Sequence, residues 1–562
     1  MMDSILHWNA AALEANRVSH SDPDKREQNG PTLSSRALAI VHLAMYDAYA
    51  GIVNNAAAFP RYLTASTAVV PAAPSPKPPT WDQDAVAGAA YRTLTALYPA
   101  QQSYFETQRG CFDTTSLSYQ FGEAIGAEML ALRANDMDAR DSGYRPSPLR
   151  GRHRVDPDNP GQGFHAPFYG AQNKCFAVTA RHALQAPPFA SGADAKYLQA
   201  LAQVRTKGIR PDLTGTLPDQ LFDQRRTPLE TVIGIYWGFD GANRLGTPPR
   251  MFNQIVRRVA ENRGNNEGQN ARLFAFVNAA MGDAGILAWE QKYCHDFWRP
   301  VVGIREHDEK FGPQAPYAGT SVSFNDGDPG WLPLGAPSTN QTAVKNFSPN
   351  FPAYPSGHAT FGAAALQITR LFYNVKKKDD DNLFPMTFVS EEFNGGNRDN
   401  DGAVRPRHAR SFPGGLWQMI IENGLSRVYL GVHWIFDAFD FSEDDDGNLV
   451  PDLTNEQIGG VGLGLRIAED IFNVNGGLTP VMPAAGAADP VIETPAPDSP
   501  LAARPAQPAS IGGCVAEEQE IAALENREQT RSVEDPFPTG SSEHGEPPTE
   551  NRDAYPSKRS KK

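Results

Sequence analysis

Residues 352–362 read PAYPSGHATFG, and the chain then continues into small apolar residues typical of a helix packed in a protein interior. Pro355 fixes the direction of the chain, Ser356 is a favoured helix N-cap residue, and Gly357 allows close approach to the backbone. The free N–H groups and the positive end of the following helix favour an anion at this point. His358, at the start of the helix, could deliver or remove a proton. Taken alone, a capped helix with an incidental histidine is the simpler interpretation.

Helical periodicity dominates the rest of the chain, whereas the alternation of apolar and polar residues expected of strands is scarce. Apolar residues recur at three- and four-residue steps in residues 37–53, 81–99, 121–136, 271–293 and 415–439. Long connections rich in Pro, Gly and Asn separate these segments. The pattern predicts a large all-α protein with long irregular loops rather than an α/β sheet.

The composition argues against several classes of function. The net charge of the 562 residues is −14, and binding of nucleic acid would need clustered Lys and Arg instead. The most apolar stretch, from Ala37, carries His42 and Asp47, so we expect a core helix rather than a membrane span. The four cysteines are scattered without a CxxC pair, which indicates neither a zinc knuckle nor a disulfide framework. Residues 479–562, rich in Pro, Ala, Glu and Ser, are expected to be a disordered tail.

A second segment, WEQKYCHDFWRP at residues 289–300, places two cations near the end of a predicted helix. Trp289 and Lys292 are three residues apart and therefore share a helical face. Arg299 is seven residues beyond Lys292, so it joins the same face if the helix continues to Pro300. Two such cations can hold an oxyanion from one side. On its own, the pair is more simply explained as solvent-facing.

A third segment, SRVYLGVHWIFD at residues 426–437, combines an arginine, a histidine and an aspartate. In an ideal helix Arg427 would lie roughly 120° around the axis from His433, so either the long Arg427 side chain or a helix break at Gly431 could bring both to one point. Asp437 could accept the second ring N–H of His433 and fix its tautomer. A lone buried histidine is more often a satisfied core residue.

Taken together, the three segments supply the groups needed to surround a tetrahedral oxyanion. They offer three cations, a hydroxyl, a backbone donor and two histidines, from Lys292, Arg299, Ser356, Gly357, His358, Arg427 and His433. One histidine could attack or ligate the central atom while the other handles protons. Such a set suits phosphoryl transfer, or the binding of a phosphate-like metal oxyanion.

These residues match a known signature, in the order K-x6-R-P, P-S-G-H and S-R-x5-H. The chain therefore resembles the superfamily of vanadium-dependent haloperoxidases and type 2 phosphatidic-acid-type acid phosphatases. Further stretches resemble the fungal-type vanadium chloroperoxidases, among them FHAPFYG at 164–170, YWGFDGAN at 236–243 and EEFNGGNRD at 391–399. The resemblance covers roughly residues 5–480.

The resemblance implies an all-α fold of two four-helix bundles, with the oxyanion in the second. On this basis residues 1–230 would form an N-terminal helical bundle region and residues 231–478 the bundle that carries the vanadate site. The implied activity is the vanadate-dependent oxidation of halide by hydrogen peroxide to hypohalous acid. A small organic acceptor is a further candidate partner, and a monomer is favoured over an oligomer.

The resemblance also assigns roles to individual residues. His433 would ligate vanadium, and the vanadate oxygens would be held by Lys292, Arg299, Ser356, the Gly357 N–H and Arg427. His358 would act as acid and base, Lys292 would also polarise bound peroxide, and Asp240 would brace Arg427 through a salt bridge. Trp289 and Phe351 would line the apolar side of a halide pocket.

Phe351 bears on the choice of halide, because a histidine often takes the corresponding place in bromide-selective members of the family. A phenylalanine there resembles the chloride-oxidising branch, so we expect chloride as well as bromide to be oxidised.

The chief alternative is an acid phosphatase that forms a phosphohistidine at His433. A non-catalytic oxyanion-binding protein is a second alternative, although binding alone does not require His358. The N-terminus shows no classical secretory signal, so location stays open between the secretion implied by the resemblance and the cytoplasm.

Overall fold

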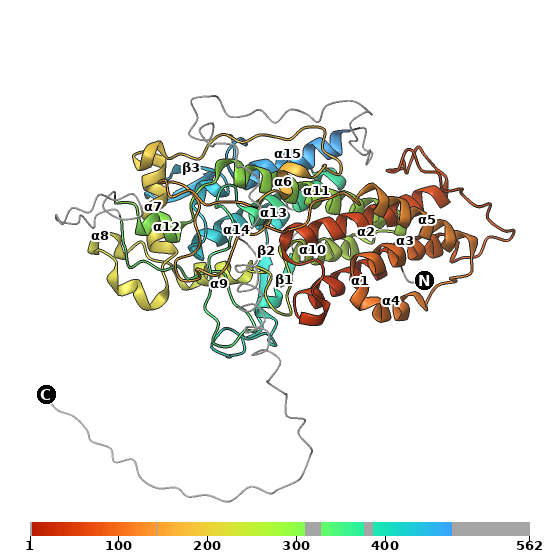
Figure 1. Cartoon of the computed structure of the whole chain (residues 1–562), viewed down its shortest axis with the longest axis horizontal. Helices are drawn as coiled ribbons and strands as arrows, with labels where there is room; N and C mark the ends of the chain where they lie inside the picture. The colour runs from red at the N-terminus through yellow and green to blue at the C-terminus, as the bar shows by residue number, and fades with distance from the viewer. Residues whose placement is uncertain (1–2, 142, 309–326, 376–385, 475–562) are drawn as a thin grey trace, which may run out of the picture.

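The computed structural model describes residues 3–141, 143–308, 327–375 and 386–474. In this part of the chain the structure is mostly helical, which confirms the predicted all-α fold (Figure 1). The strands described form two small antiparallel pairs, in which β1 (Met386–Val389) pairs with β2 (Ala409–Phe412) and β3 (Asp440–Glu443) with β4 (Leu449–Asp452). The predicted disordered tail, residues 479–562, lies outside the described residues, and the number of helical bundles stays a prediction.

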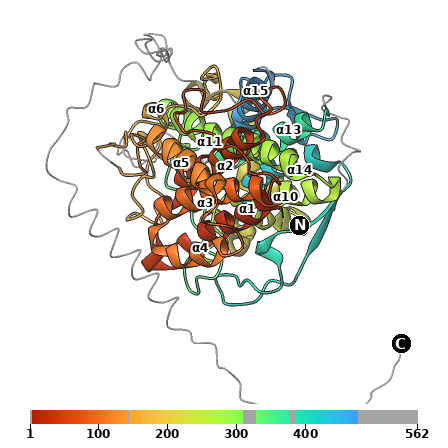
Figure 2. The ribbon, with the colours of Figure 1, turned by 90° about the vertical axis from the view of Figure 1, so that its right-hand side faces the viewer.

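The N-terminal helices gather at one end of the molecule, on the right in Figure 1 and towards the viewer in Figure 2. They are α1 (Ser4–Ser19), α2 (Gly30–Val53), α3 (Trp81–Leu97), α4 (Gln102–Arg109) and α5 (Leu117–Leu132). Glycines let α3 and α5 approach closely. A Cβ atom on Gly88 would lie 2.1 Å from the Tyr119 carbonyl oxygen, and one on Gly122 would lie 1.9 Å from that of Ala85. No larger residue fits at either position.

The remaining helices surround the segments singled out in the sequence. In chain order they are α6 (Tyr169–Gln172), α7 (Ala195–Lys207), α8 (Asp219–Phe222), α9 (Pro228–Tyr236), α10 (Pro248–Arg263), α11 (Glu267–His295), α12 (Pro300–Arg305), α13 (Gly357–Phe372), α14 (Gly415–Tyr429) and α15 (Gly459–Asn473). Nearly every side chain of α11 is buried, because this helix packs against α2 on one side and against α13 and α15 on another.

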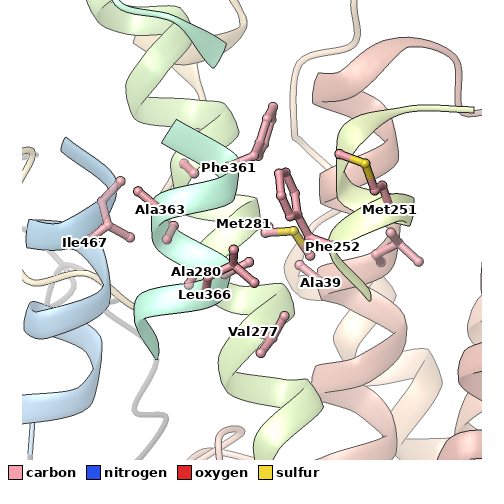
Figure 3. Packing of buried hydrophobic residues seen from close by; sticks show 14 of the residues in the cluster. Ala39, Met251, Phe252, Val277, Ala280, Met281, Phe361, Ala363, Leu366 and Ile467 are labelled. Atoms are coloured by element: carbon pink, nitrogen blue, oxygen red, sulfur yellow. The ribbon is translucent and has the colours of Figure 1, made fainter. Parts of the chain in front are cut away.

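The core around α13 holds the start of that helix in place (Figure 3). Phe361, Ala363 and Leu366 of α13 point into a cluster with Met281 of α11 and Ile467 of α15, and all five side chains are buried. Such dense packing of apolar side chains is the main favourable term that fixes the helices relative to one another.

Small residues bring α15 against the N-terminus of α13. A Cβ atom on Gly460 would lie 2.4 Å from the Ser356 carbonyl oxygen, and one on Gly464 would lie 2.6 Å from that of Thr360. Gly460 and Gly464 therefore allow α15 to pack closely against α13. The same close contact fixes the position of the PSGH segment, residues 355–358, against α15.

Two of the described helices, Gly30–Val53 and Glu267–His295, are long and apolar enough to pass a test for membrane-spanning segments. The most apolar windows of these helices are 83% and 94% buried within the protein. Their apolar surface is therefore used in the core, as expected for the stretch that begins at Ala37.

Candidate active site

The N-terminus of α13 opens onto a cavity of about 130 Å³. Ser356 is the N-cap residue, and its hydroxyl oxygen accepts a hydrogen bond from the Ala359 N–H. The predicted site residues that line the cavity are Asp240, Trp289, Phe351, Gly357, His358, Arg427 and His433. The remaining predicted residues, Lys292, Arg299 and Ser356, are buried immediately behind this lining.

His433 reaches the cavity because α14 ends before it. The sequence predicted a helix over residues 415–439, but the helix stops at Tyr429, and Gly431 takes a φ of 73° that continues the chain in a new direction. The prediction was therefore wrong beyond residue 429, whereas a break at Gly431 is confirmed. Arg427 in the last turn of α14 and His433 beyond the break both face the cavity.

The imidazole of His433 is held in one tautomer. Its Nδ1–H donates to Asp437 Oδ2 at 2.7 Å, and the Trp434 N–H donates to the same oxygen at 3.0 Å. The lone pair on Nε2 then accepts a hydrogen bond from Arg299 Nη1 at 2.9 Å. Burial, followed by the charge of Arg299, lowers the pKa of His433 well below its ordinary value, so the ring stays neutral and Nε2 remains a lone-pair donor.

Arg299 occupies the connection between α11 and α12 rather than the face of a continuous helix. Helix α11 ends at His295, Asp296 takes a left-handed φ of 53°, and Pro300 begins α12 instead of ending a helix. The predicted shared face of Lys292 and Arg299 was therefore wrong. The turn at Asp296 nevertheless carries the Arg299 guanidinium back to the site, where Nε donates to the Phe351 carbonyl and Nη1 to that of Val432, each at 2.8 Å.

Lys292 binds the segment that leads into α13. Its fully buried ammonium group donates to the carbonyl oxygens of Pro352, Ala353 and Pro355 at 2.9, 3.1 and 2.5 Å. A Cβ atom on Gly357 would lie 3.8 Å from Lys292 Cε, so the lysine passes directly behind this glycine. Burial and the nearby Arg299 lower the pKa of Lys292 well below its ordinary value.

Two guanidinium groups retain unused N–H donors. Arg427 forms a bidentate ion pair with Asp240, with distances of 2.6 Å from Nη2 to Oδ1 and 3.0 Å from Nη1 to Oδ2. Arg427 Nε and Arg299 Nη2 are buried and have no hydrogen-bond partner among the described residues. Buried donors without a partner are costly, so both groups favour an acceptor placed between them.

His358 completes the polar side of the cavity. Its Nε2–H donates to the Gly238 carbonyl oxygen at 2.6 Å, and Asp240 Oδ1 lies 3.8 Å from the same nitrogen. Burial, together with the positive charge of Arg427, lowers the pKa of His358 to about 4. The opposite wall is apolar, because the rings of Trp289 and Phe351 contact each other with centroids 4.8 Å apart.

The structure adds a residue that sequence reasoning did not single out. His165 lines the cavity, with its ring centroid 6.0 Å from that of Trp289 and 6.1 Å from that of Phe351. Its Nε2 lies 3.0 Å from the hydroxyl of Thr32 in α2, which brings the N-terminal helices to the edge of the site. His165 belongs to a loop far from the other site residues in sequence, so no helical spacing could have linked it to them.

A larger cavity of about 540 Å³ adjoins the first one. Both cavities are lined by Asp240, Gly241, Phe347 and Asn350, so the outer cavity lies directly beside the inner site. Among the described residues no group of three or more His, Cys, Asp or Glu is arranged to hold a metal cation. The donor set of the inner cavity suits an anion instead.

Comparison with known proteins places the chain in a family. Residues 2–175 match the family model of the vanadium chloroperoxidase N-terminal domain, and residues 272–441 match that of the VCPO second helical-bundle domain. The chain is 36% identical over 583 aligned residues to the vanadium chloroperoxidase of Curvularia inaequalis, an alignment that covers 85% of this chain and 90% of that protein.

Two solved structures share the fold at low sequence identity. A bacterial vanadium-dependent iodoperoxidase is 18% identical with a TM-score of 0.54, over 83% of this chain and 95% of that one. The holo form of a bacterial vanadium-dependent chloroperoxidase is 16% identical with a TM-score of 0.52, over 82% and 96% of the two chains. The extended similarity to the Curvularia protein and the two matching domain models show that this chain belongs to the vanadium chloroperoxidase family.

Proposed function

We propose that this protein oxidises halide with hydrogen peroxide to hypohalous acid, with vanadate as its cofactor. Membership of the vanadium chloroperoxidase family supports this activity. The observation that carries the proposal in this chain is the pair of unpartnered guanidinium donors, Arg299 Nη2 and Arg427 Nε, beside the Nε2 lone pair of His433. A tetrahedral oxyanion needs such donors, and a metal centre needs such a lone pair.

The charge and space around the site fit vanadate. Lys292, Arg299 and Arg427 are buried beside Asp240 and Asp437, and burial lowers the pKa of Lys292, so a bound anion would favour the charged form of this lysine. The absence of a side chain at Gly357 leaves its backbone N–H accessible at the helix N-terminus, where the helix dipole favours negative charge. Vanadate, when bound, supplies a Lewis-acidic centre that activates hydrogen peroxide without a change of oxidation state.

In this proposal each group of residues has one task. His433 would ligate the metal through Nε2, with Asp437 fixing the tautomer. The oxygens would be held by Arg299, Ser356, Gly357 and Arg427, and by Lys292 once its ammonium group turns one N–H from a backbone carbonyl oxygen towards the anion. Since the donors are fixed before the reaction, negative charge would be stabilised without reorganisation of the site. Asp240 would keep Arg427 in place through the bidentate ion pair.

His358 would move the proton of the peroxide. Its Nε2–H is donated to Gly238, so Nδ1 carries the lone pair that can take up a proton. Because its pKa is lowered to about 4, the ring is neutral at pH values above 4 and is available as a base. A proton accepted there could later be returned during formation of the hypohalous acid.

The apolar wall of Trp289 and Phe351 would exclude water from the face at which halide enters. A partly desolvated halide is a better nucleophile. We propose that the phenylalanine at position 351 favours chloride competence alongside bromide oxidation. The organic molecule that receives the halogen, if one is bound, would approach through the outer cavity.

The function is tested by measuring chlorination and bromination of monochlorodimedone with hydrogen peroxide, in the presence and absence of added vanadate. Hydrolysis of p-nitrophenyl phosphate by the protein without vanadate is measured in parallel. We expect halogenation that requires vanadate. Phosphate ester hydrolysis with no halogenation under any condition would instead favour the phosphatase, with His433 as the nucleophile.

A further inference from the structure

A short loop, residues 238–240, supplies two separate partners to the active site. The carbonyl oxygen of Gly238 accepts the Nε2–H of His358 at 2.6 Å, and the carboxylate of Asp240 pairs with Arg427 at 2.6 and 3.0 Å. The geometry of this loop therefore determines where both side chains lie. None of the sequence motifs explains what holds the loop itself.

The residue between these two is in an unfavourable conformation. Phe239 has a φ of 56°, in the left-handed region that residues with a Cβ atom seldom adopt, and its side chain is fully buried. A backbone of this kind persists only where surrounding contacts impose it. The loop must consequently be held by groups outside it.

Glu392 provides the contacts that hold the loop. The Phe239 N–H donates to Glu392 Oε1 at 3.2 Å. The Cα atom of Gly238 lies so close to the same oxygen that a Cβ atom there would approach it to 2.5 Å, so a larger residue would push against the carboxylate. The carboxylate thus fixes both the first and the second residue of the loop.

The carboxylate of Glu392 is itself held from the opposite side. Its Oε2 accepts hydrogen bonds from Arg405 Nη1 and from the hydroxyl of Thr339, each at 2.6 Å, and Arg405 Nη1 also donates to that hydroxyl at 2.8 Å. Glu392 is 0% exposed, so its charge depends entirely on these partners. Three protein donors therefore reach the carboxylate, one at Oε1 and two at Oε2.

We propose that Glu392, anchored by Arg405 and Thr339, is a positioning residue for vanadate binding and for halide oxidation. It acts on neither vanadate nor substrate directly. By fixing residues 238–240 it sets the position of the Gly238 carbonyl against His358 and of Asp240 against Arg427. The inference deepens the function proposed above and rests on it for the catalytic readout, but not for the measurement of vanadate affinity.

The first test is the Glu392→Gln variant, which keeps the size of the side chain and removes its charge. Its amide group cannot accept from both Arg405 and Phe239 without turning an N–H donor towards one of them. Vanadate affinity is measured by equilibrium dialysis, and kcat and KM for bromide are measured at saturating vanadate. We expect vanadate Kd to rise at least tenfold and kcat to fall by about tenfold to a hundredfold, because small displacements of catalytic groups are costly.

The matched control is Asp47→Asn in α2. Asp47 is also 0% exposed, pairs with Arg61 at 2.8 Å, and accepts the backbone N–H groups of Tyr62 and Leu63 at 2.7 and 3.2 Å. It therefore reproduces the bonding of Glu392 at a site that holds no loop of the cavity. We expect Asp47→Asn to lower Tm while leaving vanadate Kd and kcat within twofold of the unmodified protein.

Two milder variants keep the test decisive if Glu392→Gln does not fold. Thr339→Val removes one hydrogen bond to Oε2 at nearly constant volume, and Gly238→Ala forces a methyl group against Oε1 without any change of charge. Both variants should raise vanadate Kd and lower kcat, and the variant with the larger rise in Kd should show the larger fall in kcat.

The proposal is overturned if the Glu392 and Thr339 variants lower Tm as Asp47→Asn does but leave vanadate Kd and kcat within twofold. If the unmodified protein oxidises no halide, the proposed function fails. The differences in vanadate Kd among the variants still decide the role of Glu392 in that case.

Discussion

At the scale of single residues, two of the histidines that line the cavity, His433 and His358, differ in the ring nitrogen that each leaves available. His433 gives its Nδ1–H to Asp437 and keeps Nε2 for the site, whereas His358 gives its Nε2–H to Gly238 and keeps Nδ1. We expect His433→Ala to weaken vanadate binding by at least about 100-fold, since loss of a ligand should exceed the loss of an outer partner. We expect His358→Ala to keep vanadate Kd within a few fold while kcat falls by about 100-fold or more.

Equilibrium dialysis of vanadate and steady-state kinetics with bromide distinguish these outcomes. His408→Ala is a suitable control, because His408 is exposed and belongs to a loop away from the cavity lining. Equal losses of vanadate affinity in the His433 and His358 variants would contradict the division of roles.

Asp437 allows a second prediction at this scale. The Asp437→Asn variant keeps an acceptor for His433 Nδ1–H but can also present an N–H donor, which would favour the wrong tautomer of the imidazole. We expect vanadate Kd to rise by about 10- to 100-fold, as for other partners of metal-ligating histidines. An unchanged Kd would show that the tautomer is fixed by something other than Asp437.

The sequence indicates which chemical groups the site residues contribute better than it indicates where the fold places them. The segments around Lys292, His358 and His433 name the donors for an oxyanion, and the structure brings them to one cavity. It does so by turns at Asp296 and Gly431, both of which have positive φ. The glycine at position 431 allowed a break to be considered there, but helical spacing cannot foresee the turn at Asp296. The contribution of Glu392 is also hidden, because it depends on contacts between segments distant in sequence.

At the scale of helices, close packing against α15 fixes the position of the N-terminus of α13. Gly460→Ala would drive a methyl group against the Ser356 carbonyl, and Gly464→Ala would do the same at Thr360, one turn further from the cavity. Overpacking of this kind costs about 1–3 kcal/mol. We expect both variants to lower Tm, and Gly460→Ala to raise vanadate Kd more than Gly464→Ala.

Gly215→Ala is the control for both substitutions, because a Cβ atom on Gly215 meets nothing within 4 Å and its φ is not positive. Differential scanning calorimetry and vanadate dialysis give the two readouts. If all three variants had the same Tm as the unmodified protein, the close packing of α13 and α15 would be less strict than these distances indicate.

The presence of a helix was easier to predict from the sequence than the residues at which it begins and ends. The apolar periodicity of residues 81–99 and 271–293 corresponds to α3 and α11, but α5 begins at Leu117 and α14 ends at Tyr429. Apolar residues recur at helical spacing through residues 430–439, although this segment is not a helix. Burial in the core stabilises apolar side chains in any backbone conformation, so the spacing alone does not show a helix.

At the scale of the whole molecule, buried neutral histidines connect stability to pH. Burial lowers the pKa of His20, His42, His165 and His295 to about 4 in each case, below the unfolded value of 6.5. These groups bind protons in the unfolded chain before they do so in the folded one. Their contribution to stability is therefore complete above pH 6.5 and is lost as the pH falls towards 4. The raised pKa values of buried carboxyl groups, among them Asp283 at about 6 and Asp437 at about 7, act in the opposite direction.

His42 offers a clean test of this pH dependence. Its Nε2 accepts from Asn9 at 2.9 Å and its Nδ1–H donates to the Leu38 carbonyl at 2.7 Å, so the neutral ring is fully bonded in the core. His42→Gln removes one titrating group. We expect the difference in unfolding free energy between the two proteins to change by up to about 1.4 kcal/mol per pH unit between pH 6.5 and 4. Parallel stability curves, measured by thermal unfolding at several pH values, would contradict this assignment.

Helix α11 has a consequence for how the chain can be divided. It is covered by α2 on one side and by α13 and α15 on another. Removal of the chain before residue 231 would therefore leave the face of α11 that packs against α2 without a partner. A fragment that begins there would present that apolar face to water and should aggregate when produced alone. Co-production with residues 1–230 should restore a soluble, noncovalent assembly able to bind vanadate. The two parts of the chain would then behave as obligate complementing fragments.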